Sequence, residues 1–260
     1  MLPAMHMLNP HCGVDRDPRG VVRLTICNAG SLNILGTPVI NAVREGLEAL
    51  ATERQLRVLV LAGESEKSMI GGADIREMAK LDQASAEKFI TGLRDLCEAV
   101  RGFPTPVIAR MPGWCLGGGL EVAAACDFRI AAHDAKFGMP EVRVGIPSVI
   151  HAALLPRLIG WGRARWLVMT AENIDAATAL AWGLVDVVAP SGGLDAAVEH
   201  TIAALLECAP EALRAQKALL RQWEELPLKQ SVDLSIGVFG QSFLTGEPQR
   251  LMQAFVERKR

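Results

Sequence analysis

The sequence lacks the features that mark proteins of nucleic acids and of membranes. Its 27 basic and 29 acidic residues leave a formal charge of −2, and no basic cluster is present to bind a phosphate backbone. Every apolar run is interrupted well before the ~20 residues that a transmembrane helix needs. Residues 1–13 contain neither Lys nor Arg and no long apolar segment, which argues against a secretory signal peptide. We therefore expect neither nucleic acid nor a membrane among the partners of this protein.

Patterns of cysteine and histidine that build disulfide frameworks or metal sites are also missing. The six cysteines form no CxxC pair, so they are predicted to be reduced thiols, mostly in the core of a cytoplasmic protein. The five histidines occur without an HExxH motif and without a cluster of cysteines. We therefore expect no dedicated metal site.

The composition that is present is that of a soluble globular protein. Half of the residues are hydrophobic and 22% are charged. At 260 residues the chain can form one large domain or two small ones, and it can bury a substantial core.

Strand and helix patterns alternate up to about residue 190, which predicts an α/β fold with crossover connections. The turn signature Asp17-Pro18-Arg19-Gly20 predicts a hairpin. Thr37 is expected to cap a helix that has Pro38 at its first position, and Asp74 to cap a helix that begins at Ile75. The other predicted elements are strands at 21–27, 56–62, 107–110, 127–132 and 135–138 and a helix at 85–101.

The pattern changes near residue 193, where strand signals stop. Four successive helical patterns follow, separated by Pro or Gly. We therefore divide the chain into a mixed core, residues 1–192, and a helical region, residues 193–260, whose apolar stripes must pack on the core or on another subunit.

One stretch, residues 113–141, carries the strongest functional signal. Three glycines at 117–119 precede an apolar run that contains one carboxylate, Glu121, and a second carboxylate, Glu141, follows Met139-Pro140. A glycine-rich helix start leaves backbone N–H groups bare and favours negative charge. Two glutamates near such donors could act as an acid–base pair. The stretch is therefore predicted to hold the active site.

Structural explanations of the same residues remain open at the level of sequence. Glu121 could be a solvated residue in the first turn of a helix, and Glu141 could form a surface salt bridge with Arg143. The glycines at 71–72 and 117–119 could serve a turn and helix packing. Ser148 has no GxSxG context that would make it a nucleophile. His151 is expected to line the pocket rather than to act as a general base.

The ordered set of motifs resembles the crotonase superfamily, and in particular its enoyl-CoA hydratases. SMIGGADIREM is similar to the first oxyanion-hole segment of the family, and GWCLGGGLEVAAACDFRIAA is similar to the second. FGMPEVRVGIP is similar to the region of the second catalytic glutamate. The resemblance extends over roughly residues 20–258.

The resemblance implies a right-handed spiral of ββα repeats, followed by a helical region that forms trimers, with hexamers as dimers of trimers. It implies an acyl-CoA thioester as substrate and requires no cofactor or metal. The thioester oxygen would lie between the N–H groups of Gly71 and Gly118, which would stabilise an enolate. The substrate-binding residues expected from it are Gly71, Gly72, Ala73, Asp74, Ile75, Trp114, Gly117, Gly118, Pro140 and His151.

The same resemblance implies hydration of a 2-enoyl-CoA to a 3-hydroxyacyl-CoA, with Glu121 as the base for water and Glu141 exchanging a proton with Cα. Other reactions of the superfamily remain alternatives: double-bond isomerisation, decarboxylation or thioester hydrolysis. A subunit that binds acyl-CoA without turnover is a further alternative. Fold alone does not distinguish among them.

The sequence departs from the family pattern at two places. Residues 147–157 replace a glycine-rich segment, and the bulkier Ile150 and His151 are expected to narrow the acyl pocket wall, which favours a short, branched or sulfur-containing enoyl group. The basic residue that many members place before Ala-Leu-Asn is here Gly30, ahead of Ser31-Leu32-Asn33. Other basic residues are therefore expected to bind the CoA phosphates.

Overall fold

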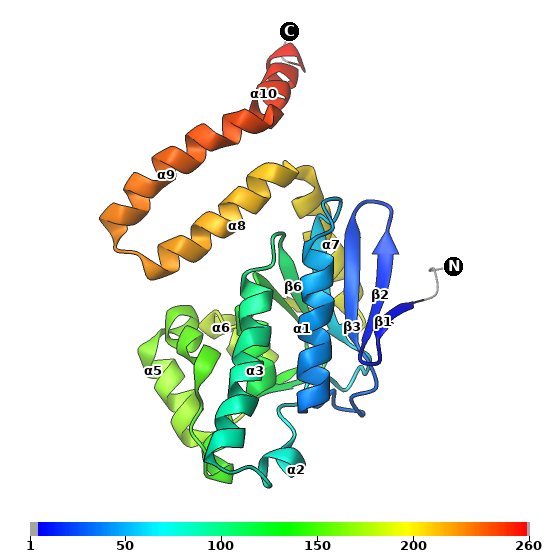
Figure 1. The fold of residues 1–260 in the computed structure, drawn as a ribbon, viewed down its shortest axis with the longest axis vertical. Helices are drawn as coiled ribbons and strands as arrows, with labels where there is room; N and C mark the ends of the chain where they lie inside the picture. Colours follow the sequence, from blue (N-terminus) through cyan, green and yellow to red (C-terminus); the bar gives the residue numbers. More distant parts are fainter. Residues whose placement is uncertain (1–4, 259–260) are drawn as a thin grey trace.

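The computed structural model describes residues 5–258, which form two β-sheets, the helices that cover them and an extended helical arm (Figure 1). The strands are β1 (His6–Asn9), β2 (Cys12–Asp17), β3 (Val21–Ile26), β4 (Val58–Gly63), β5 (Ser68–Ile70), β6 (Val107–Met111), β7 (Trp114–Leu116), β8 (Phe128–Ala132), β9 (Lys136–Gly138), β10 (Ile174–Asp175) and β11 (Val187–Ala189). The α-helices are α1 (Thr37–Ala51), α2 (Ile75–Met78), α3 (Gln83–Arg101), α4 (Gly118–Ala125), α5 (Leu155–Thr170), α6 (Ala176–Trp182), α7 (Leu194–Glu207), α8 (Pro210–Glu225), α9 (Leu228–Ser242) and α10 (Glu247–Arg258). Three short 3₁₀ helices are η1 (Glu141–Val144), η2 (Ile150–Leu154) and η3 (Phe243–Thr245).

The two sheets arise from a repeated strand–strand–helix unit. The larger sheet has the order β1-β2-β3-β4-β6-β8-β11, and the smaller has the order β10-β9-β7-β5. In three successive turns the first strand (β4, β6, β8) enters the larger sheet and the second (β5, β7, β9) enters the smaller, before the chain continues into a helix. This arrangement confirms the predicted α/β spiral of ββα repeats.

The strand pairing follows from sequence pattern and turn chemistry. The predicted hairpin forms between β2 and β3, where the N–H of Gly20 donates to the carbonyl of Asp17 at 2.9 Å. The next pairs, β3–β4, β4–β6 and β6–β8, are parallel. All residues of β4 are buried, as expected for a continuous apolar run covered on both faces.

Helices α1 and α3 lie side by side over one face of the larger sheet and close the main core (Figure 1). Asp74 caps α2 as predicted, accepting hydrogen bonds from two backbone N–H groups. Two helix starts differ from prediction. The N-cap of α1 is Gly36, because the Thr37 hydroxyl donates to Glu77 from α2, and α3 begins at Gln83, because Asp82 caps it in a capping box with Ser85.

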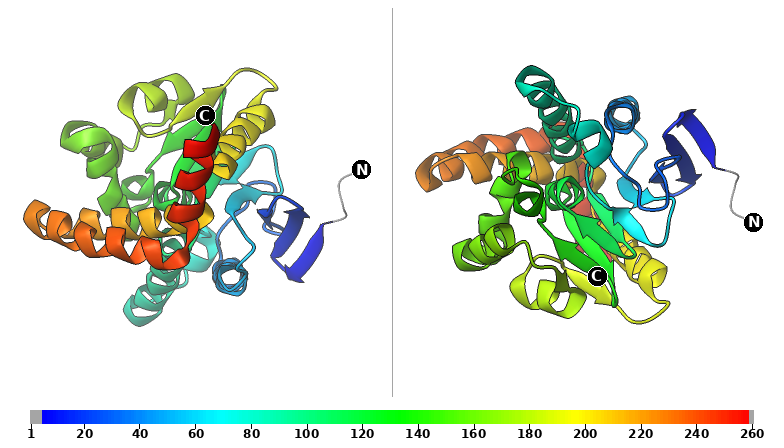
Figure 2. Two further views of the ribbon diagram at one scale, coloured as in Figure 1. Left: turned by 90° about the horizontal axis from the view of Figure 1, so that it is seen from above. Right: turned by 90° about the horizontal axis from the view of Figure 1, so that it is seen from below.

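The all-helical region begins at α7, as predicted, but its helices have different surroundings. Helix α7 packs on the opposite face of the larger sheet through Val198, Ile202 and Leu205. Helices α8, α9 and α10 extend beyond the core, and Figure 2 shows them crossing the molecule when it is seen from above. The buried carboxylate of Glu247 in α10 accepts a hydrogen bond from the N–H of Ala212 in α8 at 3.1 Å. This bond links the two ends of the helical arm formed by α8, α9 and α10. The division at residue 193 into a core and a trimerisation region stays a prediction, and residues 259–260 of the last predicted helix lie outside the described part.

Candidate active site

The predicted catalytic residues meet at a cavity of about 330 Å³ that is lined by parts of α3, α4, η1 and the loop after β5. Its lining contains both glutamates and most of the expected substrate-binding residues. The predicted residues that line the cavity are Gly71, Gly72, Ala73, Ile75, Gly117, Gly118, Glu121, Pro140 and Glu141. Positions 70 residues apart in sequence therefore share one concave surface, of the kind that binds small molecules.

Glu121 lies in the first turn of α4 and only 4% of its surface is exposed. Its Oε1 accepts a hydrogen bond from the N–H of Ala152 at 2.9 Å. Burial raises the pKa of Glu121 to about 8; the hydrogen bond from Ala152 opposes this rise, and the nearby charge of Glu141 adds to it. The alternative of a solvated helix carboxylate is wrong, because apolar neighbours surround this position.

Glu141 opens η1 directly after Pro140, and its Oε2 accepts a hydrogen bond from Ser148 Oγ at 2.9 Å. Burial raises the pKa of Glu141, while hydrogen bonds from its own backbone N–H and from Ser148 act in the opposite direction. No ion pair within residues 5–258 joins Glu141 to Arg143, so the salt-bridge alternative is wrong. The two carboxyl groups therefore share a cavity in which both bind protons more tightly than in water.

Gly117 brings the glycine-rich turn against Glu141. Its φ is +52°, and a Cβ atom at this position would lie 2.5 Å from Glu141 Oε1. Its N–H donates to the carbonyl of Gly138 at 2.9 Å, which fixes the turn to β9. A side chain at position 117 would therefore be strained and would displace the carboxylate.

The backbone N–H groups of the two glycine loops differ in availability. The N–H of Gly71 donates to the carbonyl of Leu32 at 2.7 Å and is not free, contrary to its predicted role as an oxyanion donor. The N–H groups of Ala73 and Gly118 donate to no acceptor within residues 5–258. Leu32 could not be recognised as the partner from sequence, because the contact joins segments that are far apart in the chain.

Three of the expected substrate-binding residues do not line the cavity. Asp74 caps α2, Trp114 lies on β7 with its ring partly exposed, and His151 is buried with its Nε2 at 2.9 Å from Glu98 Oε1 of α3. Ile150 is also absent from the lining. Neither residue therefore lines this cavity, because the His151 side chain bonds to α3 instead, and the expected effect on the acyl group stays a prediction.

Several lining residues were not predicted. Phe89 and Leu93 are four residues apart on α3, and this helical spacing of apolar side chains could have indicated a shared face. Arg143 is exposed and lines the cavity without an ion-pair partner in residues 5–258. Ser148 donates to Glu141 from outside the lining, and it carries no motif that would have identified it. The other unpredicted lining residues are Met78, Ile90, Leu116, Val144, Ile146, Pro147 and Val149.

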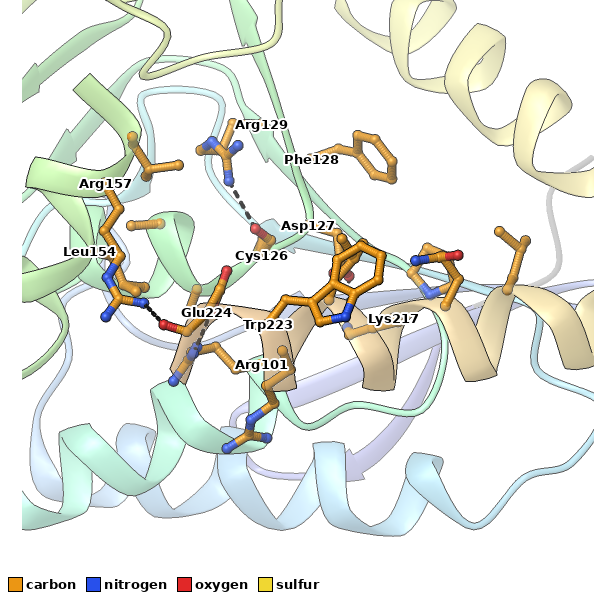
Figure 3. Close-up of a pocket in the computed structure, with 18 of the residues that line it drawn as sticks. Arg101, Cys126, Asp127, Phe128, Arg129, Leu154, Arg157, Lys217, Trp223 and Glu224 are labelled. Carbon is orange, nitrogen blue, oxygen red and sulfur yellow. Dashed lines mark hydrogen bonds and ion pairs between the residues drawn. The ribbon is translucent and has the colours of Figure 1, made fainter. Parts of the chain in front are cut away.

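A second cavity of about 610 Å³ lies between the end of α4, the start of α5 and α8 (Figure 3). Its charged groups are already paired: Lys217 with Asp127 at 2.6 Å, and Arg157 with the carbonyl of Glu224. None of the predicted functional residues lines it. We therefore place the candidate site in the smaller cavity.

Within residues 5–258, no group of three or more His, Cys, Asp and Glu side chains is arranged to hold a metal ion. None of the helices in that range combines the length and apolar character needed to cross a membrane.

The fold and the cavity together define a class of protein. A spiral of ββα turns places a glycine-rich helix start, N–H groups with no acceptor in residues 5–258, the buried carboxyl group of Glu121 and the half-buried one of Glu141 around one cavity, which can stabilise an oxyanion and transfer protons. The profile of the enoyl-CoA hydratase/isomerase family matches residues 16–260. The chain belongs to this family, within the crotonase superfamily, and is an enoyl-CoA hydratase-like enzyme.

Individual relatives agree with this assignment over nearly the whole chain. The chain is 32% identical to crotonyl-CoA hydratase of Syntrophomonas wolfei over 231 residues, which cover 88% of this chain and 89% of the relative. It is 33% identical to short-chain-enoyl-CoA hydratase of Clostridium acetobutylicum, with 92% of each chain covered. The crystal structure of an enoyl-CoA hydratase from Mycobacterium smegmatis matches with a TM-score of 0.92 and 28% identity, covering 96% of this chain and 97% of that one.

Proposed function

We propose that this protein is a hydro-lyase that adds water to a 2-enoyl-CoA and forms a 3-hydroxyacyl-CoA. The observation that carries the proposal is the meeting of Glu121 and Glu141 at one cavity with unoccupied backbone donors. Relatives with the names crotonyl-CoA hydratase and short-chain-enoyl-CoA hydratase support the same reaction and a short acyl group.

The oxyanion hole in this proposal consists of the N–H groups of Ala73 and Gly118. Both residues line the cavity, and neither N–H group has an acceptor within residues 5–258, whereas the N–H of Gly71 donates to Leu32. Addition of water to the conjugated double bond places negative charge on the thioester oxygen as an enolate. Two fixed donors stabilise this charge, and loss of one such donor typically costs ~3–4 kcal/mol of transition-state stabilisation.

The two glutamates divide the proton transfers. Glu121 in its ionised form accepts a proton from the attacking water, and Glu141 in its protonated form supplies the proton at Cα. Burial raises the pKa of both groups, and the proposed division uses the state of the pair in which Glu141 alone holds a proton. No cofactor takes part in the proposed steps.

Absorbance of the conjugated enoyl thioester tests the reaction directly. Incubation with crotonyl-CoA is expected to bleach the enoyl band without release of free thiol, whereas thioester hydrolysis would liberate CoA. Glu121→Gln and Glu141→Gln are each expected to lower kcat at least 100-fold while leaving CoA-thioester binding nearly intact. Persistent turnover in both variants would contradict the assigned roles, and intact binding without any turnover by the wild type would favour a non-catalytic subunit.

The proposal includes a homotrimer or a homohexamer in the cytoplasm. Helix α9 and the 3₁₀ helix η3 that follows it carry apolar side chains that one chain leaves exposed, such as Leu228 (81%) and Leu244 (87%). The six cysteines are free thiols, which fits a reducing compartment. Light scattering should give three or six times the mass of one chain, and Ile236→Asp on the exposed face of α9 should lower this mass, whereas Gln230→Asp on the same helix should not.

A further inference from the structure

The turn that bonds Glu121 is held in a strained backbone conformation. Its 3₁₀ helix η2 supplies the Ala152 N–H that lies 2.9 Å from Glu121 Oε1. The first residue of this helix, Ile150, has a φ of +38°. β-branched side chains rarely adopt positive φ, and such strain persists only where surrounding contacts enforce it. Some interaction beyond the turn itself must therefore hold η2 in place.

His151, the next residue, makes the contact that can do so. Its side chain is buried, and its Nε2 lies 2.9 Å from Glu98 Oε1 on α3, which identifies Nε2 as the nitrogen that carries the proton. Its Nδ1 is buried without a partner within residues 5–258. Burying an imidazole with one unpaired nitrogen costs free energy of folding. This cost argues that His151 orients the η2 turn and does not serve the general stability of the protein.

Glu98 is itself a fixed acceptor. Its carboxylate binds the guanidinium groups of Arg101 on α3, at 3.1 Å, and of Arg221 on α8. Burial acts to raise the pKa of Glu98, but the hydrogen bond from His151 and the two arginines outweigh it and lower the pKa. Burial lowers the pKa of His151 despite the facing carboxylate, so the imidazole is neutral at neutral pH and donates through a single N–H.

We propose that His151 is a positioning residue whose hydrogen bond to Glu98 holds the strained turn so that the Ala152 N–H stays on Glu121. The inference rests on the proposed hydration, in which Glu121 is the base. The contacts run from Glu98 on α3 through His151 to the backbone of η2, where the Ala152 N–H donates to the carboxylate of Glu121. Glu141 and the buried Cys97 are the other titratable groups that face Glu121.

The position of the η2 turn controls the fraction of Glu121 that is ionised. A backbone N–H that donates to a carboxylate favours its charged state. When η2 relaxes and the N–H moves away, Glu121 holds its proton to higher pH and a smaller fraction is available as base. The orientation of the carboxylate toward water is lost at the same time.

The test compares four variants by kcat, KM and the pH dependence of kcat/KM with crotonyl-CoA. His151→Ala should lower kcat about tenfold with little change in KM and move the acidic limb to higher pH. His151→Gln, which retains an N–H donor of similar reach, should recover most of the loss. Ile150→Gly combined with His151→Ala should also recover activity, because glycine adopts a φ of +38° without strain. His200→Ala on the exposed face of α7 is the matched control and should match the wild type.

Titration of Glu121 gives a readout that does not depend on turnover. Carboxyl-labelled glutamate followed by ¹³C NMR, with Glu121→Gln for assignment, should show a higher pKa in His151→Ala than in the wild type. Wild-type kinetics and an unchanged Glu121 titration in His151→Ala would overturn the proposal. A wild type that titrates as expected but does not hydrate any enoyl-CoA would instead reject the proposed function and leave the positioning role standing.

Discussion

Ser148 donates a hydrogen bond from its Oγ to Oε2 of Glu141 at 2.9 Å, seven residues back along the chain. The contact crosses the sharp turn after η1, where Gly145 has a φ of +85°. It ties one of the two cavity carboxylates to a fixed donor, in the same way that the Ala152 N–H is tied to Glu121. Each glutamate therefore has one external donor that orients it.

Loss of this donor should weaken catalysis more than binding. In Ser148→Ala the Glu141 carboxylate loses its orienting hydrogen bond, and we expect kcat to fall about tenfold with KM changed less than about twofold. Ser148→Thr retains the hydroxyl and is the matched control. Steady-state kinetics with crotonyl-CoA measure both constants, and an unchanged kcat in Ser148→Ala would show that the hydrogen bond does not matter for turnover.

Substitution of Gly117 should damage the site beyond the cost of backbone strain. In Gly117→Ala the new Cβ meets Glu141 Oε1, and we expect a loss of kcat/KM of at least about 100-fold. Gly192 also has a positive φ, of +71°, but has open space around its Cα. Gly192→Ala should therefore show a similar loss of thermal stability with nearly normal kcat/KM. Equal activities of the two variants would contradict the contact with Glu141.

The dependence of kcat/KM on pH should be bell-shaped. Glu121 must be ionised to accept a proton from water, and burial raises its pKa to about 8. When Glu121 holds its own proton it cannot act as base, so kcat/KM should fall toward acidic pH, and it should also fall at alkaline pH, where Glu141 loses the proton that it supplies to Cα. A pH profile measured from pH 5 to 9 in the wild type and in Glu121→Gln checks both limbs. A wild-type profile without an acidic limb would contradict the role of Glu121 as base.

The same shift predicts how stability depends on pH. Glu121 binds its proton up to about pH 8 in the folded protein but only up to its ordinary value of 4.5 when unfolded. Its contribution is therefore fully present below about pH 4.5 and is lost as pH rises through 8, by an amount on the order of a few kcal/mol.

Glu121→Gln isolates this effect, because a neutral amide cannot ionise. The variant should unfold at a higher temperature than the wild type at pH 9 and at nearly the same temperature at pH 4.5, as followed by circular dichroism. A difference in Tm that does not change with pH would contradict the buried, proton-binding state of Glu121.

Much of the fold was predictable because local patterns and long-range packing agree. The apolar run of β4, the turn before β3 and the cap at Asp74 all form as expected. The error at the start of α3 was local, because the capping box of Asp82 and Ser85 is present in the sequence. The error at the start of α1 has a tertiary cause, because Thr37 bonds to Glu77, which is 40 residues away. Such a partner competes with the expected cap and is invisible in a window of sequence.

The order of residues along the chain was enough to identify the glycine-rich helix start, both glutamates and the family, because each depends on a short motif with its own chemistry. Three properties of the site required the folded chain. The carbonyl of Leu32 accepts a hydrogen bond from the N–H of Gly71. The side chain of His151 bonds to Glu98 outside the cavity lining, and burial raises the pKa of Glu121. Each depends on groups that meet only when distant segments pack, since hydrogen-bond partners and exclusion of water are set in three dimensions.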